Sequence, residues 1–172
     1  MNYFQLFELP VQLKTDKNTV RKKYLEQSKK SHPDYFVNGS EADQQKALEH
    51  FAFLNKGLKT LTNDEETIKY VLQLKGLLED EERYTLRPDF LMKMMEINEQ
   101  LAEMELEEDT SKKGELLQIL DRTENEIYAP VKNSIENYKE GVTSDEELLQ
   151  VKDYYFKKKY VARLRQQLSG KL

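Results

Sequence analysis

Hydrophobic residues recur along most of the chain every three or four positions, which is the spacing of one face of an α-helix. The clearest examples lie within residues 47–58 and residues 90–104, where polar residues occupy the remaining positions. No segment shows the regular alternation of polar and apolar residues that is typical of a half-buried strand. With only six Gly and four Pro, the chain interrupts its helices at few points. The pattern predicts an all-α protein.

The N-terminal part of the chain predicts the first arm of a helical hairpin. The apolar segment 3–9 is short and should dock onto larger elements. A helix should begin at Thr15 or Asp16, which are both good N-caps. It should end at His32, because Pro33 disfavours helical backbone at the residue before it. The inner face of this helix is expected to comprise Val20, Tyr24 and Leu25.

The second arm should follow a loop over residues 33–40. Ser40 is a good N-cap for a second long helix, and the short connection favours antiparallel packing of the two arms. A further helix is expected to begin at Thr62, where Thr62-x-x-Glu65 has the form of a capping box. We expect this helix to end at Gly76.

Three helices are predicted in the second half of the chain. The first should start with Pro88 in its first turn and reach about Glu108. After a break at residues 109–114, the second should cover residues 115–138, with a kink at Pro130. The third should be capped by Ser144-x-x-Glu147 and reach about Leu168.

These elements predict two helical domains. Residues 1–76 form the hairpin domain, and residues 86–172 form a three-helix bundle. Residues 77–85 are polar and lack periodicity, so they are interpreted as a linker.

The composition excludes several classes of protein. The chain contains no Cys, which excludes disulfides, thiol nucleophiles and Cys-ligated zinc or iron–sulfur clusters. No run of about 18 apolar residues is present, so no membrane partner is expected. The N-terminal sequence lacks the pattern of a signal peptide or an organelle presequence, so a cytoplasmic location is expected.

Charge is distributed unevenly along the chain. The net charge is −5, so the basic footprint of a nucleic-acid-binding protein is absent and no nucleic-acid partner is expected. Residues 17–35 carry six basic and two acidic side chains, whereas residues 90–109 carry one basic and seven acidic side chains. This contrast indicates either two different partners or one solvated surface with local bias.

The tripeptide His32-Pro33-Asp34 follows the basic helix directly, and three interpretations compete. A metal or catalytic site is disfavoured, because no Cys or HExxH-type spacing accompanies it and no GxSxG motif or Gly-rich phosphate loop occurs. We therefore predict no catalytic residue, no metal ligand and no cofactor. A plain turn is the second interpretation. The third is a recognition loop, in which proline limits the entropy lost on binding and Asp34 accepts hydrogen bonds from a partner.

The order of these features resembles a J-domain, the module by which co-chaperones stimulate a DnaK-type ATPase. The matching stretches are "YFQLFEL", the basic helix 17–31, "HPD" at 32–34 and the helix 41–59 that carries "FLNKGLKTL". By this resemblance, the chaperone-binding residues are His32, Pro33, Asp34, Arg21, Lys22, Lys23, Lys29 and Lys30.

Two departures from the usual J-domain pattern occur. Ser31 and Tyr35 flank the tripeptide where many J-domains have Tyr and Lys. Gly57 stands where alanine is usual, and glycine inside a helix costs about 0.5–1 kcal/mol.

On a helical wheel, residues 90–104 have two apolar sides. One side forms the expected core, namely Phe90, Met94, Ile97, Leu101 and Met104. The other side carries Leu91, Met92 and Met95 among glutamates. Methionine suits an adaptable binding surface, and an exposed apolar patch with a polar rim often marks an interface. The alternative is that these residues pack against the linker or the hairpin domain.

A J-domain followed by an acidic three-helix bundle is similar to the HscB family, the co-chaperones of iron–sulfur cluster assembly. The stretch "DFLMKMMEINEQLAEME" carries most of this resemblance, which implies that the helix binds an IscU-type scaffold protein. The scaffold-binding residues are then Leu91, Met92, Met95, Glu96, Glu99, Glu103 and Phe156. Phe156 rests on the resemblance alone, because its helix is apolar on too many sides for periodicity to select it. The start at "MNYFQLF" and the absence of Cys match the bacterial type, which lacks an N-terminal zinc segment.

The resemblance implies an adaptor that stimulates a DnaK/HscA-type ATPase and delivers an IscU-type scaffold to it, without catalytic groups of its own. The main alternative is a general J-domain co-chaperone whose bundle holds a different client or dimerises. A His/Asp hydrolase and a passive helical scaffold are two further alternatives.

Overall fold

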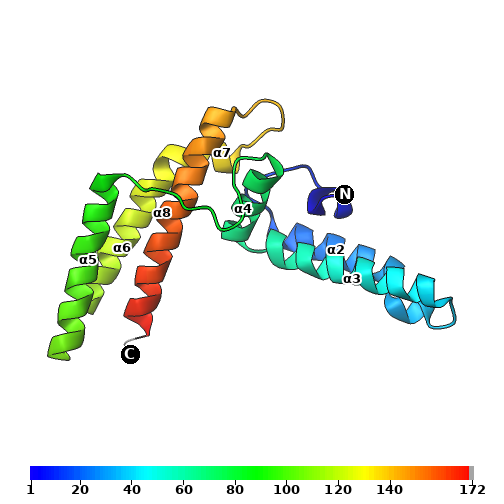
Figure 1. Cartoon of the computed structure of the whole chain (residues 1–172), viewed down its shortest axis with the longest axis horizontal. Coiled ribbons are helices and arrows are strands. Elements are labelled where there is room, and N and C mark those ends of the chain that lie inside the picture. The colour runs from blue at the N-terminus through cyan, green and yellow to red at the C-terminus, as the bar shows by residue number, and fades with distance from the viewer. Residues whose placement is uncertain (171–172) are drawn as a thin grey trace. The chain divides into compact units, whose positions relative to one another are not determined.

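The computed structural model describes residues 1–170, and within them the regular structure is helical and contains no strand (Figure 1). The prediction of an all-α protein is therefore confirmed. In chain order, the elements are α1 Tyr3–Leu6, α2 Lys17–Ser31, η1 Pro33–Phe36, α3 Glu41–Leu61, α4 Asp64–Leu74, α5 Pro88–Glu107, α6 Lys113–Tyr128, η2 Ala129–Val131, α7 Lys132–Glu136 and α8 Asp145–Ser169.

The chain divides into two compact units. The first unit comprises Met1–Gly76 together with Ile135–Thr143. The second comprises Leu77–Ser134 and the chain from Ser144 onwards. Residues 135–143, which the sequence pattern predicts to be part of the bundle, thus group with the first unit.

Helices α2 and α3 form the predicted hairpin and lie side by side (Figure 1). The side chain of Asp16 accepts hydrogen bonds from the backbone N–H groups of Asn18 and Thr19, which fixes the start of α2. Val20 is fully buried. Leu25 is 55% exposed, so its predicted place on the inner face of α2 is wrong. It lies five residues after Val20 on the helix, and that step turns its side chain away from α3.

The start of α4 differs from the prediction. Asn63 caps this helix by accepting a hydrogen bond from the backbone N–H of Glu66. Thr62, the predicted cap, instead ends α3, and its hydroxyl donates to the carbonyl oxygen of Leu58 at 2.6 Å. Because α3 reaches Leu61, Thr62 is already committed to its C-terminus and cannot begin α4.

Within the first unit, the segment 135–143 contacts the end of α4 through an ion pair. Lys75 and Glu140 form this pair, and the hydroxyl of Tyr138 donates to Glu140 at 2.7 Å. The hydrogen bond from Lys75 lowers the pKa of Glu140 below its ordinary value, and the same contact raises the pKa of Lys75. The ion pair therefore stabilises the charged forms of both Lys75 and Glu140.

Gly57 allows a close approach between α3 and the aromatic start of the chain. A Cβ atom at this position would lie 2.8 Å from Cε2 of Phe7 and 3.1 Å from Cδ1 of Tyr3. The Phe7 side chain is fully buried and so has no free space into which to move. The departure from the usual alanine is thus a packing requirement of this chain.

We expect Gly57→Ala to lower the free energy of unfolding by about 1–3 kcal/mol, because the added methyl group overpacks the contact with Phe7. Urea denaturation measures this change. Gly114→Ala is the matched control: Gly114 lies in the first turn of α6 with no atom within 4 Å of an added Cβ. It should stabilise the protein by about 0.4–1 kcal/mol. Equal stabilisation by both substitutions would contradict the steric role of Gly57.

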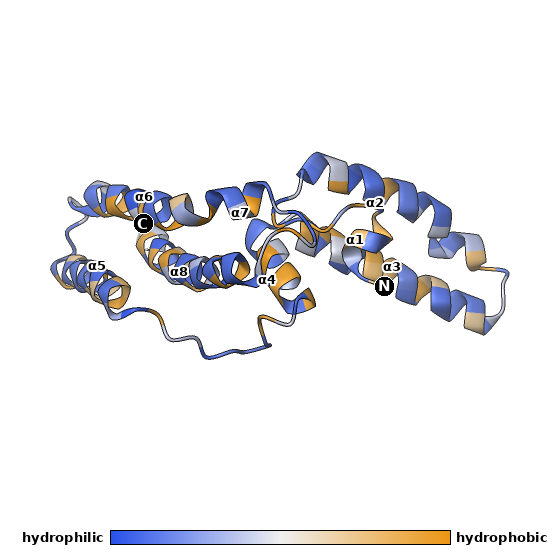
Figure 2. Cartoon of the chain, turned by 90° about the horizontal axis from the view of Figure 1, so that it is seen from above, coloured by the Kyte–Doolittle hydropathy of each residue, from blue (hydrophilic) through white to orange (hydrophobic). Residues whose placement is uncertain are grey.

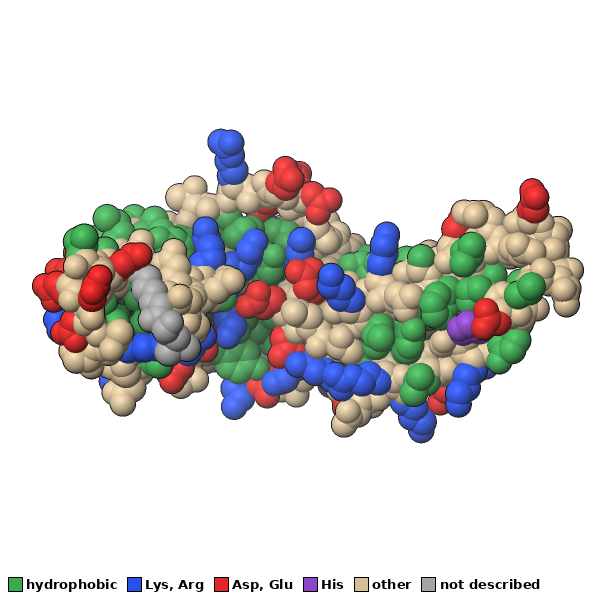
Figure 3. Space-filling model, turned by 90° about the horizontal axis from the view of Figure 1, so that it is seen from below, with side chains coloured by type: hydrophobic (Ala, Val, Ile, Leu, Met, Phe, Trp, Pro, Cys, Tyr) green, Lys and Arg blue, Asp and Glu red, His purple; other side chains and the backbone are tan. Residues whose placement is uncertain are grey.

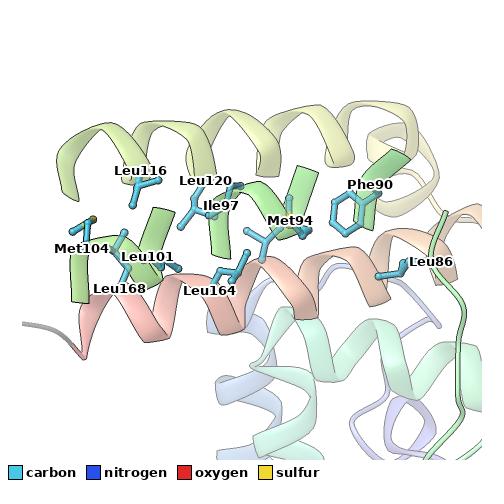
Figure 4. Close-up of a cluster of buried hydrophobic side chains, with 11 residues drawn as sticks. Leu86, Phe90, Met94, Ile97, Leu101, Met104, Leu116, Leu120, Leu164 and Leu168 are labelled. Carbon is cyan, nitrogen blue, oxygen red and sulfur yellow. The ribbon is translucent and has the colours of Figure 1, made fainter. Parts of the chain in front are cut away.

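Helices α5, α6 and α8 form the core of the second unit. Figure 2 shows that each of them carries both hydrophobic and hydrophilic residues along its length. Side chains from all three helices meet between them (Figure 4). The buried cluster consists of Leu86, Phe90, Met94, Ile97, Leu101, Met104, Leu116, Leu120, Val161, Leu164 and Leu168. Full burial of one such side chain contributes about 1.5–3 kcal/mol relative to exposure. All five α5 residues predicted for the core side are in this cluster, so that prediction is confirmed.

The predicted interruptions of the bundle are partly correct. Pro130 interrupts the second bundle helix, since a 3₁₀ turn at Ala129–Val131 separates α6 from α7. The capping box of α8 is present, because Ser144 accepts from the backbone N–H of Glu147 at 3.1 Å and Glu147 accepts from that of Ser144. The predicted break at residues 109–114 is shorter than expected, because α6 begins at Lys113.

Candidate functional site

The end of the helical hairpin presents the His32-Pro33-Asp34 tripeptide, which we call the hairpin tip. His32 caps α2, and Pro33 opens the 3₁₀ turn η1. The Nδ1 atom of His32 accepts a hydrogen bond from the backbone N–H of Asp34 at 3.2 Å. The His32 ring packs edge-on against Phe51 of α3, with a centroid separation of 5.3 Å. Proline and these two contacts thus restrict the backbone of the tip.

The Asp34 carboxylate at the hairpin tip faces solvent. Its side chain is 82% exposed, and Oδ2 lies 3.4 Å from Nδ1 of His32. Figure 3 shows a histidine beside an acidic side chain at the end of the hairpin, with hydrophobic side chains around them. Tyr35 and Val37, which follow Asp34 closely in the chain, are both exposed, and the ring of Tyr35 lies edge-on to His32 with centroids 6.2 Å apart. A carboxylate in this position can accept hydrogen bonds from a cationic group of a partner.

The predicted basic residues of α2 are not equivalent. Arg21, Lys22, Lys29 and Lys30 are exposed. Lys23 is less exposed and lies 3.4 Å from the carboxylate of Glu8. Its charge is therefore partly balanced within the chain, whereas the charges of the other four face solvent.

The predicted scaffold-binding residues of α5 form one surface, which we call the α5 face. It comprises Leu91, Met92, Met95, Glu96, Glu99 and Glu103. Met92 is 63% exposed and Met95 is 57% exposed, although both are large apolar residues. The three glutamates are also exposed. Met95 and Glu99 line a shallow depression together with Asn98 and Ala102.

Leu91 and Phe156 come together in a groove of the second unit, although they lie on different helices. Leu91 packs against the edge of the bundle core and is half-buried. Phe156 stacks on Tyr84, with ring centroids 4.5 Å apart and an angle of 4° between the rings. The structure therefore places Phe156 beside the edge of the α5 face. Helical periodicity within one segment could not predict this proximity.

Tyr84 is a further residue of this region that the sequence pattern missed, because residues 77–85 were interpreted as a linker. Its hydroxyl donates to Oδ1 of Asp153 at 2.9 Å. Burial, followed by this hydrogen bond, raises the pKa of Tyr84 to about 12. The ring is held on Phe156 as a neutral phenol. Tyr84 is an isolated aromatic residue in a polar stretch, so no helical or strand periodicity of apolar residues could predict its place in the groove.

In residues 1–170 no group of three or more His, Asp or Glu side chains is arranged to hold a metal ion. None of the helices in that range has the length and apolar character needed to span a bilayer.

The all-helical fold and the His-Pro-Asp tip between two antiparallel helices define the class of J-domain co-chaperones. Comparison with protein families narrows this class. The family model described as the HSCB C-terminal oligomerisation domain matches residues 86–169. A co-chaperone protein HscB homolog of Shewanella pealeana is 32% identical over 180 residues, covering 98% of this chain and 95% of the relative. The chain belongs to the HscB family of co-chaperones.

A further relative and one solved structure agree with this assignment, and a second solved structure agrees with the fold. The HscB homolog of Vibrio cholerae serotype O1 is 37% identical over 102 residues, covering 59% of this chain but only 60% of the relative. The structure of the chaperone HscB from Vibrio cholerae has a TM-score of 0.75 at 25% identity and covers 98% of this chain and 96% of that chain. The structure of the human co-chaperone protein HscB has a TM-score of 0.80 at 24% identity, covers 98% of this chain and 81% of that chain, and supports the fold alone.

Proposed function

We propose that the protein is an adaptor that stimulates the ATPase of a DnaK/HscA-type chaperone and delivers an IscU-type iron–sulfur scaffold protein to it. In this proposal the protein acts in the cytoplasm. Residues 1–76 engage the chaperone, residues 86–172 hold the scaffold, and residues 77–85 connect the two. The adaptor contributes binding surfaces, and the chaperone contributes the catalytic groups for ATP hydrolysis.

The observation that carries the proposal is the presence of two chemically different exposed surfaces on a family member. The cations of α2 suit an acidic surface of a partner, because opposite charges steer association. The exposed Asp34 of the hairpin tip suits a cationic group on the same partner. The α5 face presents exposed Met92 and Met95 between exposed glutamates. A surface of this kind suits a partner with an apolar patch and basic groups at its margin.

The proposed mechanism is co-delivery. Docking of the hairpin tip on the chaperone in its ATP state triggers hydrolysis, and the scaffold on the α5 face is brought to the same chaperone. Tethering of this kind raises the effective concentration of the client and strengthens its capture by ~10²–10⁴ without new contacts. The chain therefore accelerates the cycle by joining two partners.

A steady-state ATPase assay tests this function. The turnover of a DnaK/HscA-type chaperone is measured alone, with this protein, with the IscU-type scaffold, and with both. We expect stimulation by this protein and a larger stimulation when the scaffold is also present, because both partners then act on one chaperone. An unchanged rate in all four mixtures would contradict the proposed function.

A dimerising bundle is the alternative that the matched family model supports. Because the matching family model is described as an oligomerisation domain, a bundle that dimerises is the second candidate. Sedimentation equilibrium of the purified chain distinguishes this candidate, since it predicts a dimer in the absence of any scaffold.

A further inference from the structure

The cations of α8 fall into two groups that differ in their ion pairing. Four of them have carboxylate partners: Lys152 with Glu82 at 2.7 Å, Lys157 with Asp153 at 2.8 Å, Lys158 with Glu124 at 3.6 Å and Arg165 with Asp121 at 2.7 Å. Lys159 and Arg163 are exposed, and no carboxylate of residues 1–170 lies within 4.0 Å of either cation. Two cations of this helix are therefore left without a neutralising carboxylate among residues 1–170.

These two cations belong to one side of the groove that contains Leu91 and Phe156. The groove encloses about 680 Å³, and Arg83 also lines it. Lys159 lies over the ring of Tyr155 at 5.5 Å, and Arg163 lies over the ring of Tyr160 at 5.1 Å. Cation–π contacts hold the positive groups beside the apolar surface without cancelling their charge.

The groove is continuous with the α5 face. Leu91 belongs to both surfaces. Further along α5, Asn98 and Ala102 line the depression next to Met95 and also the crevice between α5 and α8. The combined surface is apolar along its centre. Its margin on α5 carries glutamates, and its margin on α8 carries Lys159 and Arg163.

We propose that this combined surface accepts one partner segment of mixed polarity. The segment is apolar along its centre, carries basic groups on the side that meets the α5 glutamates, and carries acidic groups on the side that meets Lys159 and Arg163. This inference rests on the proposed function and deepens it, since the segment belongs to the IscU-type scaffold. Opposite charges on the two margins fix the orientation of the bound segment, because the reversed orientation places like charges together.

The double variant Lys159→Glu/Arg163→Glu tests the inference. Isothermal titration of the IscU-type scaffold should give an affinity at least ~10-fold below that of the unaltered protein, because the acidic side of the segment then meets like charges. The difference should shrink at high salt, since these charges are exposed and become screened. Both side chains are exposed and form no ion pair with any residue of the described range 1–170, so the fold should be retained, which circular dichroism and thermal unfolding check.

A matched control carries the same change in net charge outside the groove. Lys112→Glu/Arg122→Glu alters two exposed cations, of which Lys112 precedes α6 and Arg122 lies on α6. The affinity of this variant for the scaffold should stay within ~2-fold of that of the unaltered protein. Equal affinity of the groove variant and the unaltered protein would overturn the inference while leaving the proposed function intact. A changed oligomeric state with unchanged scaffold affinity would assign the groove to a second copy of the chain and also overturn it. Failure of the unaltered protein to bind the scaffold would overturn the proposed function itself.

Discussion

His32→Gln is expected to abolish stimulation of the chaperone ATPase while the chain remains folded and still binds the scaffold. Glutamine removes the ring that packs against Phe51 and the Nδ1 acceptor for the backbone N–H of Asp34. The hairpin tip then loses two of the contacts that restrict its conformation. Truncation of a hot-spot residue at the centre of an interface costs about 2 kcal/mol or more, which is roughly a 30-fold loss of affinity. Steady-state ATP turnover by the chaperone measures the effect.

The second histidine provides the matched control for this prediction. His50 lies half-buried on α3, outside the hairpin tip. His50→Gln should leave the stimulation close to that of the unaltered protein. Full stimulation by His32→Gln, or equal losses for both variants, would contradict the assignment of the hairpin tip. Activity of the purified chain on a substrate without any chaperone, lost in His32→Gln, would instead favour the hydrolase alternative.

Met92→Ala combined with Glu99→Ala is expected to remove most of the affinity for the IscU-type scaffold. Met92 is 63% exposed, so its truncation removes apolar contact area from the interface without opening a cavity in the core. Removal of the Glu99 charge takes away the proposed partner for basic groups of the scaffold. Together the two changes should weaken binding by about 10- to 100-fold, or about 1.4–2.8 kcal/mol. Isothermal titration provides the dissociation constants.

A variant of matched chemistry on another helix separates a local effect from general destabilisation. Glu146→Ala combined with Leu149→Ala removes one exposed glutamate and one exposed apolar side chain from the start of α8. This variant should bind the scaffold as the unaltered protein does. ATPase stimulation in the absence of scaffold should be normal for both double variants. Retained binding by Met92→Ala/Glu99→Ala would remove the α5 face from the proposed interface.

Much of the helical architecture is predictable from local sequence, because the relevant interactions join residues within about one helical turn. Asp16, Ser40 and Ser144 act as the N-caps that were predicted. One failure arises where two elements meet. Thr62 has a good capping pattern, but it ends α3, because local propensity cannot decide which of two adjacent helices uses a residue.

The candidate surfaces also include one feature that local sequence predicts and one that depends on contacts between distant residues. Exposure of Met92 and Met95 follows from the helical wheel of a single segment, and the structure agrees. The stacking of Phe156 on Tyr84 does not follow from any wheel, because the two residues are 72 positions apart. Non-local contacts of this kind depend on how the whole chain packs, which the local spacing of residue types does not encode.

The amino-acid sequence by itself determined the all-α class, the position of the hairpin tip and the two sides of α5, since each depends on backbone propensity and periodicity within one segment. Only the tertiary structure decided that Gly57 makes room for Phe7 and that, within residues 1–170, no carboxylate pairs with Lys159 or Arg163. The physical reason is that steric contact and charge neutralisation depend on distances between side chains, and folding brings together groups that are remote along the chain.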